Sequence, residues 1–82
     1  MVKSSFHEKF KKTFSKIKDK ELKNRIIKQF SKIRDNPEIG KPMRNVRKGT
    51  REVYVSPYRL SYIYIKEEDK VIFLDLYHKD EQ

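Results

Sequence analysis

The stretch from Gly49 to Ile65, GTREVYVSPYRLSYIYI, predicts a pair of β-strands and so decides the class of fold. Residues 51–55 and 59–66 are dense in the Val, Ile and Tyr residues that favour strands, and residues 70–78 have the same character. The polar letters KEED, residues 66–69, predict a hairpin turn. Consecutive strands with short connections pair antiparallel, so a small, twisted antiparallel sheet is expected here.

The first half of the chain has a helical period instead. Residues 6–17 are expected to form an amphipathic helix capped by Ser5, and Asp19 is expected to cap a second helix that ends before the segment DNPEIG. The apolar positions of the first helix are Phe6, Phe10, Phe14 and Ile17, and those of the second are Leu22, Ile26, Ile27, Phe30 and Ile33. The two helices are expected to form an antiparallel hairpin.

Together these elements predict an α+β fold, in which the N-terminal helical hairpin packs on one face of the sheet and the other face stays exposed. The letters RNV, residues 44–46, suggest a further short strand, and residues 1–3 a weak strand at the sheet edge. At 82 residues the chain is expected to be a single domain, residues 1–82.

Composition limits the possible functions. The sequence has no Cys, so neither a disulfide framework nor a thiolate metal site is expected. No segment approaches the roughly 20 apolar residues of a membrane span, and the start of the chain has no apolar run typical of a leader. A soluble protein of the cytoplasm is the expectation.

Positive charge is concentrated in the middle of the chain. Residues 1–40 carry 12 Lys and Arg against 5 Asp and Glu, residues 41–59 carry 6 against 1, and residues 60–82 carry 3 against 6. A Lys-rich face often serves only solubility, but acid is scarce here and the net charge is +9. A polyanionic partner, either nucleic acid or an acidic protein, explains this excess better.

Arg51 and Arg59 stand out because the planar guanidinium binds phosphate oxygens in pairs, as an ammonium group does not. The alternative is structural: either Arg could form a cross-strand ion pair with Glu52 or Asp75. Five Tyr residues on the predicted strands suit base stacking, yet aromatic residues also fill half-buried sheets. About three of the five are expected to be structural, with Tyr58 the main exception.

His78 and Lys79 close the last predicted strand, where they could transfer protons or simply be solvated. No metal site is expected, because the two His residues are far apart in sequence and the acids cluster in the KEED turn. No Gly-rich phosphate loop or nucleophile elbow is present.

The segment DNPEIGKPMRNVRKGTREVYVSPYRLSYIYIKEEDKVIFLDLYHKDE and the order of elements resemble the RelE/ParE superfamily of toxin–antitoxin toxins, more particularly its archaeal RelE-type members. The resemblance covers nearly the whole chain. Its most specific pieces are NP and a Gly after the second helix, G-x-R entering a strand, YRLSY, and HK closing the last strand.

This resemblance implies a toxin that cleaves messenger RNA in the ribosomal A site without a metal or other cofactor, and that a RelB-like antitoxin silences. It implies catalytic roles for four residues: Arg51 and Arg59 as phosphate clamps, Lys79 in charge neutralisation or proton transfer, and His78 as a possible acid or base. Several RelE toxins have a second Lys where this chain has Val53. The expected RNA- and ribosome-binding residues are Lys41, Arg44, Arg47, Lys48 and Tyr58.

Two alternatives remain open at this stage. A ParE-like toxin would poison DNA gyrase and cut no RNA, although such chains generally lack the basic set Arg51, Arg59 and Lys79. A plain RNA-binding module would track the backbone with basic residues and show steep salt dependence without cleavage.

Overall fold

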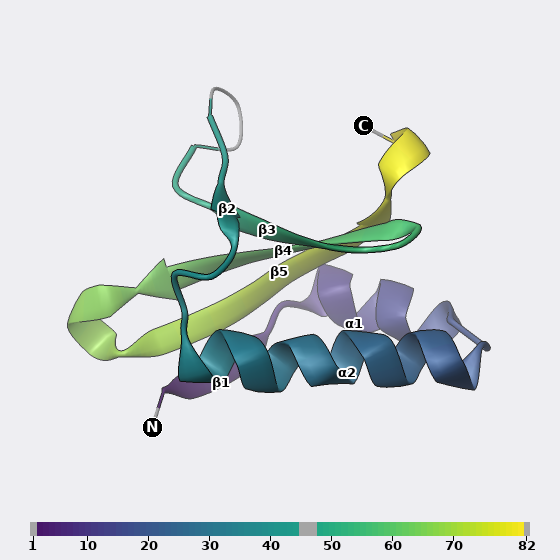
Figure 1. Cartoon of the computed structure of the whole chain (residues 1–82), viewed down its shortest axis with the longest axis horizontal. Coiled ribbons are helices and arrows are strands. Elements are labelled where there is room, and N and C mark those ends of the chain that lie inside the picture. Colours follow the sequence, from purple (N-terminus) through teal and green to yellow (C-terminus); the bar gives the residue numbers. More distant parts are fainter. Residues whose placement is uncertain (1, 45–47, 82) are drawn as a thin grey trace.

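The computed structural model describes residues 2–44 and 48–81 and has two helices packed against one face of a five-stranded sheet (Figure 1). The α+β class expected from the sequence is therefore confirmed. The elements are β1 (Lys3–Phe6), α1 (Glu8–Lys16), α2 (Lys20–Asp35), β2 (Lys41–Pro42), β3 (Arg51–Val55), β4 (Tyr58–Ile65) and β5 (Lys70–His78). Single 3₁₀ turns span Lys66–Glu68 and Lys79–Glu81.

The sheet is mixed rather than antiparallel throughout. Its strand order is β1-β5-β4-β3-β2, and the pairs from β2 to β5 are antiparallel. At the edge, β1 runs parallel to β5, with Lys3 beside Lys70 and Phe6 beside Phe73. The weak edge strand predicted at residues 1–3 thus exists, but it lies further along the chain.

The first helix begins two residues later than predicted, because Phe6 belongs to β1 and His7 caps the helix. The His7 N–H donates to the Phe73 carbonyl at 2.8 Å, which continues the β1–β5 ladder and keeps Phe6 extended. His7, not Ser5, caps α1, since its Nδ1 accepts from the Lys9 N–H at 3.1 Å. Phe6 still meets the aromatic core, with its ring centroid 5.1 Å from that of Phe73.

The second helix follows the sequence closely. Asp19 Oδ1 accepts from the N–H groups of Glu21 and Leu22 at 3.0 and 3.2 Å, so the predicted cap is confirmed. Ile27 is the exception within the predicted stripe, being 48% exposed. Neither helix in the described part of the chain is long and apolar enough to cross a bilayer.

The short strand suggested at residues 44–46 falls mostly outside the described residues. The strand before β3 is β2, where Lys41 pairs with Glu52 and Pro42 with Arg51. Arg44 lies beyond this strand, and residues 45 and 46 lie outside the described residues. The ladder gains one further bond, from the Met43 N–H to the Thr50 carbonyl at 2.9 Å.

The core fills the space between the helices and one face of the sheet. Helical and sheet residues that are nearly inaccessible to water form it: Phe10, Ile17, Leu22, Ile26, Ile33, Val55, Leu60, Tyr62, Val71, Phe73 and Leu76. Because strand residues alternate between faces, these positions fix which neighbours point away from the helices.

The Tyr62 hydroxyl joins the segment after α2 to the sheet. It accepts from the Gly40 N–H at 2.9 Å and donates to the Pro37 carbonyl at 2.8 Å. A Cβ at Gly40 would lie 2.6 Å from this oxygen, so the close approach requires Gly. Burial raises the pKa of Tyr62 above its ordinary value of 10.0.

Replacing Tyr62 with Phe should lower the free energy of unfolding by about 1–3 kcal/mol, because the Gly40 N–H and Pro37 carbonyl lose their buried partner. The raised pKa means that the wild-type contribution is complete below pH 10 and is lost as pH rises through the folded-state pKa. Urea unfolding between about pH 7 and pH 11 measures both effects. An alkaline loss of stability of equal size in Tyr62→Phe would contradict this role.

Candidate functional site

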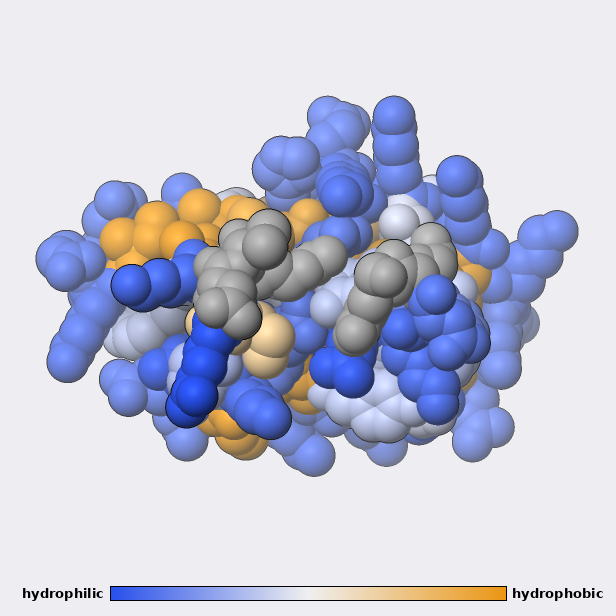
Figure 2. All heavy atoms as spheres, turned by 90° about the horizontal axis from the view of Figure 1, so that it is seen from above, coloured by the Kyte–Doolittle hydropathy of each residue, from blue (hydrophilic) through white to orange (hydrophobic). Residues whose placement is uncertain are grey.

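The sheet face opposite the helices, called the open face from here on, carries the polar strand residues. Leu60 is in the core, so its neighbours Arg59 and Ser61 point to the open face. Their cross-strand partners share that face, which gives one row of Tyr54, Arg59 and Tyr77 and a second row of Lys41, Glu52, Ser61 and Asp75. The view from above, onto this side, shows mostly hydrophilic residues (Figure 2).

Arg59 lies at the centre of the open face. Its Nη1 is 3.7 Å from Glu52 Oε1, and its guanidinium carbon is 5.9 Å from the centroid of the Tyr54 ring. The Glu52 side chain is only 3% exposed, and its Oε2 accepts from the Tyr77 hydroxyl at 2.5 Å. The cross-strand ion pair considered as the structural alternative is therefore present, although 38% of the Arg59 side chain remains accessible.

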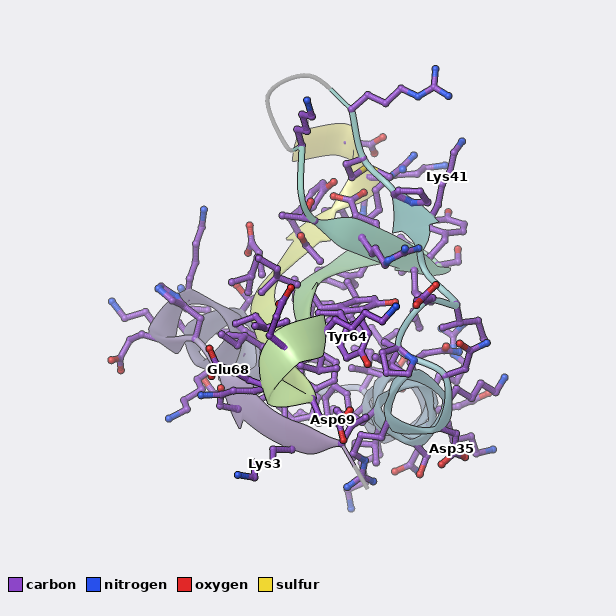
Figure 3. The ribbon with its side chains drawn as sticks, turned by 90° about the vertical axis from the view of Figure 1, so that its left-hand side faces the viewer. Lys3, Asp35, Lys41, Tyr64, Glu68 and Asp69 are labelled. Atoms are coloured by element: carbon purple, nitrogen blue, oxygen red, sulfur yellow. The ribbon has the colours of Figure 1, made fainter. Side chains whose placement is uncertain are left out.

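A groove of about 750 Å³ adjoins Arg59, and its lining is Lys41, Pro42, Met43, Arg44 and Arg59. Within residues 2–44 and 48–81, neither Lys41 nor Arg44 makes an ion pair. Lys41 also lies away from the acidic turn that carries Glu68 and Asp69 (Figure 3). Three of the predicted functional residues thus meet at one positively charged groove.

Arg51 does not join them. It pairs with the core residue Tyr62, so it points to the helix side of the sheet, opposite to Arg59. Its Nη1 donates to the carbonyls of Glu38 and Gly40 at 3.1 and 2.9 Å. The expected convergence of Arg51 with Arg59 is thus wrong. Arg51 and Tyr54, the cross-strand partner of Arg59, are three positions apart on β3, so their side chains point to opposite faces.

His78 and Tyr58 also lie on the other face. They are cross-strand partners whose ring centroids are 5.7 Å apart, and Tyr58 packs against the core. His78 Nδ1 accepts from the Asp80 N–H at 3.2 Å. The structure therefore does not bring His78 to Arg59, nor does it present Tyr58 beside Arg59 for base stacking.

The remaining predicted residues lie at the ends of strands and in the loop before β3. Lys79 opens the last 3₁₀ turn with an exposed side chain, and its N–H donates to the Pro57 carbonyl at 3.0 Å. Lys48 is exposed just before Gly49, and Arg47 lies outside the described residues. No group of three or more His, Asp or Glu side chains in the described ranges is placed to hold a metal ion.

The sequence analysis did not predict that Tyr77 supports the site, nor that the alternation of strand residues places Arg51 and His78 on the face opposite Arg59. Tyr77 stands directly across from Arg59 and holds the carboxylate that Arg59 meets. The signal was available in the spacing, because a two-residue turn at Ser56 and Pro57 pairs Arg59 with Tyr54 and Glu52 with Ser61.

The comparison with protein families decides the class of protein. A model described as the ParE toxin of type II toxin-antitoxin system, parDE, matches residues 4–82. The chain belongs to this ParE toxin family. The RelE/ParE superfamily expected from the sequence is confirmed. Comparison with curated protein sequences gives no significant match.

Solved structures show that this ParE-family toxin shares its fold with RelE-type toxins. It is similar to the RelBE2 toxin-antitoxin complex from Mycobacterium tuberculosis, with a TM-score of 0.83 at 22% identity over 95% of this chain and 98% of that one. The archaeal RelE-RelB complex from Pyrococcus horikoshii gives a TM-score of 0.79 at 14% identity over 99% and 98%. A YoeB/ParE toxin from Agrobacterium tumefaciens gives 0.83 at 11% identity over 94% and 98%.

Replacing Tyr77 with Phe should destabilise this toxin by about 1.5–3 kcal/mol, because the buried Glu52 carboxylate loses a hydrogen-bond donor. Tyr54→Phe is the matched control on the same face: its hydroxyl donates to Ser56 Oγ at 3.3 Å and is exposed, so the expected change is within about 0.5 kcal/mol. Chemical unfolding compares them. Equal effects of the two substitutions would show that Tyr77 does not support Glu52.

Proposed function

We propose that this toxin acts on RNA, by binding messenger RNA in the ribosomal A site with its open face and cleaving it without a metal. The observation that carries the proposal is the groove in which Arg59 meets Lys41 and Arg44. Of the three residues, Arg59 comes from β4, Lys41 from β2, and Arg44 from just beyond β2.

A single-stranded RNA backbone fits this groove electrostatically. Each phosphate that meets a Lys or Arg releases condensed counterions, so binding strengthens with the number of such contacts. Lys41 supplies a compact ammonium charge along the groove, and Arg44 supplies a planar guanidinium that can bind two phosphate oxygens. The Arg59 guanidinium is held in place by the buried Glu52 carboxylate. Because that contact is 3.7 Å long and on one side only, guanidinium N–H groups remain for a phosphate.

The proposed reaction is attack by a ribose 2′-oxygen on the adjacent phosphorus. The bond from phosphorus to the 5′-oxygen breaks, the 2′-hydroxyl proton passes to a water molecule, the 5′-oxygen gains a proton, and a 2′,3′-cyclic phosphate results. Arg59 stabilises the extra negative charge of the phosphorane. Lys79, two residues after the cross-strand partner of Arg59, is the proposed proton donor to the 5′-oxygen.

Arg51 and His78 are not part of this mechanism, because both lie on the helix side of the sheet. The protein therefore offers few proton-transfer groups of its own, and the ribosome must orient the RNA for attack. We propose that activity depends on the ribosome for this reason, and that the toxin works in the cytoplasm.

The proposed partner that silences the toxin is a RelB-like antitoxin. The Pyrococcus horikoshii structure is a RelE-RelB complex, and a similar protein with an acidic segment over the groove would meet Lys41, Arg44 and Arg59 directly. Such a segment excludes RNA from the same surface. No cofactor is required by the proposed chemistry.

A ParE-like action on DNA gyrase is the second candidate. The family match favours it, and so does the separation of Arg51 and His78 from Arg59, because a gyrase poison needs no acid–base set. The two candidates differ in product: one gives cut messenger RNA, and the other gives DNA breaks with intact transcripts.

Replacing Arg59 with Ala should lower messenger RNA cleavage in a purified translation system by about a hundredfold or more, because one donor to the phosphorane is lost. Arg59→Lys keeps the charge that Glu52 meets but not the forked geometry, so it should fold and remain impaired. Arg34→Ala, on the exposed surface of α2, removes the same charge elsewhere and should leave cleavage unchanged. Full cleavage by both Arg59 variants would refute the assignment, and gyrase inhibition without cleavage would establish the second candidate.

Replacing Lys41 with Ala should weaken RNA binding to a similar degree for all sequences, since a phosphate contact carries no base information. The slope of log affinity against log salt should fall by about 0.7, the value for one phosphate on a single strand. Fluorescence anisotropy with labelled RNA over a range of salt concentrations measures this. An unchanged slope would exclude Lys41 from backbone contact.

A further inference from the structure

A second hollow lies on the helix side of the sheet, beside the end of β4. It measures about 320 Å³, and its lining includes Glu38, Pro42, Gly49, Arg51, Tyr64 and Lys66. Of these residues only Pro42 also lines the groove of the open face. The volume falls within the roughly 300–1,000 Å³ that is typical of small-molecule sites. The hollow is therefore a separate place for a ligand.

Two residues give this hollow its room and an aromatic wall. Gly49 has a φ of +94°, in the left-handed region, and a Cβ added to it would have no heavy atom within 4 Å, so the space beside it is open. Tyr64 is two residues from the core residue Tyr62 and points to the same side of the sheet, where it packs against the core. The hollow thus offers a planar ligand an aromatic surface on which to stack.

Arg51 reaches the hollow with only part of its guanidinium bound. Nη1 donates to the carbonyls of Glu38 and Gly40 at 3.1 and 2.9 Å. The guanidinium has three further N–H groups, on Nη2 and Nε. Within residues 2–44 and 48–81, neither of these nitrogens has a hydrogen-bond partner, and neither is buried away from water. Arg51 is therefore oriented by the protein and keeps donors for an anion.

Lys66 adds a second cation to the hollow, and Glu38 adds a carboxylate. Lys66 is exposed at the start of the 3₁₀ turn after β4, and neither residue forms an ion pair in the described part of the chain. Two cations match the charge of a phosphate monoester, about −1.5 to −2 at pH 7. A bare anion is repelled by Glu38, whereas sugar hydroxyls donate hydrogen bonds to it. The lining therefore suits a ligand that has both a phosphate and hydroxyl groups.

The Tyr64 hydroxyl lies near acidic groups at this end of the molecule. Burial raises the pKa of Tyr64 above its ordinary value of 10.0, and the carboxylates of Asp69 and Glu38 raise it further. The phenol is therefore neutral at pH 7 and does not repel a phosphate. Tyr64 and Asp69 lie at the end of the molecule that carries the turn after β4, apart from Lys41 (Figure 3).

We propose that this hollow binds a nucleoside monophosphate, either a free nucleotide or the 5′-phosphorylated end of an RNA. The phosphate binds Arg51 and Lys66, the base stacks on Tyr64, and the ribose hydroxyls donate to Glu38. A ligand held in this way joins the segment before β2 to β3 and to the end of β4. The site lies on the opposite side of the sheet from Arg59, so it does not depend on RNA cleavage at the open face.

The test is calorimetric titration of the whole chain with AMP, adenosine and inorganic phosphate. AMP should bind about tenfold or more tightly than either fragment, because only AMP reaches both the cations and the aromatic wall. Lys66→Ala and Tyr64→Leu should each weaken AMP binding about tenfold, the first by loss of a charge-assisted contact and the second by loss of base stacking. Lys28→Ala, on the exposed surface of α2, removes the same charge elsewhere and should leave the affinity unchanged.

A short RNA with and without a 5′-phosphate distinguishes the two sources of the ligand. Affinity equal to that of AMP only when the RNA is phosphorylated assigns the hollow to RNA ends, and weaker binding of both RNAs assigns it to free nucleotides. Circular dichroism verifies that each variant folds.

Three results would overturn the proposal. The first is absence of AMP binding, and the second is equal affinity for AMP and inorganic phosphate, which would indicate a simple anion site. The third concerns location: Arg59→Ala should leave AMP binding unchanged, since Arg59 points to the open face. Loss of AMP binding in Arg59→Ala, with full affinity in Lys66→Ala and Tyr64→Leu, would place the nucleotide in the groove of the open face instead.

Discussion

The buried hydroxyl of Tyr62 connects the helical layer to the sheet, and the rest of the structure depends on this connection. It holds the segment between α2 and β2 through Gly40 and Pro37, and Arg51 binds the carbonyls of the same segment from its place on β3. With this segment fixed, β2 is brought alongside β3, and Lys41 reaches the open face. A contact on the core side of the sheet thus determines which cations meet on the other side.

The positive and negative side chains of this molecule lie mostly in different places, and only some of them form ion pairs. Arg59 meets a buried carboxylate, whereas Lys41 and Arg44 remain without ion pairs in the described part of the chain. Glu52 holds the Arg59 guanidinium in place, while Lys41 and Arg44 add positive charge along the groove. The acidic residues Glu68 and Asp69 lie in the turn after β4, away from Lys41 (Figure 3). A surface arranged in this way attracts a polyanion to one side of the sheet.

Much of the fold was readable from the sequence, because the signals were local. The Asp19 cap, the bounds of β3 and β5, and the apolar face of α2 all follow from residue type and spacing. The arrangement of the candidate site residues could not be read in this way, because the face to which a strand residue points depends on register. β4 reads YRLSYIYI, with large apolar or aromatic residues at both alternating sets of positions, so its pattern does not reveal which face is buried. The parallel pairing of β1 and the bulge at Leu74 depend on hydrogen bonds between distant segments, for which KSSF and FLDL carry no local signal.

The parallel pairing of β1 with β5 has a consequence for biosynthesis. Among the described residues, β1 pairs with β5, which follows it by more than sixty residues, and β5 also carries Tyr77, which supports the Glu52–Arg59 pair. A nascent chain that lacks residues 70–78 leaves β1 without its parallel neighbour and the open face incomplete. The pairing of Arg59, Glu52 and Tyr77 on the open face is therefore completed only after residues 70–78 have been made and have paired with β4.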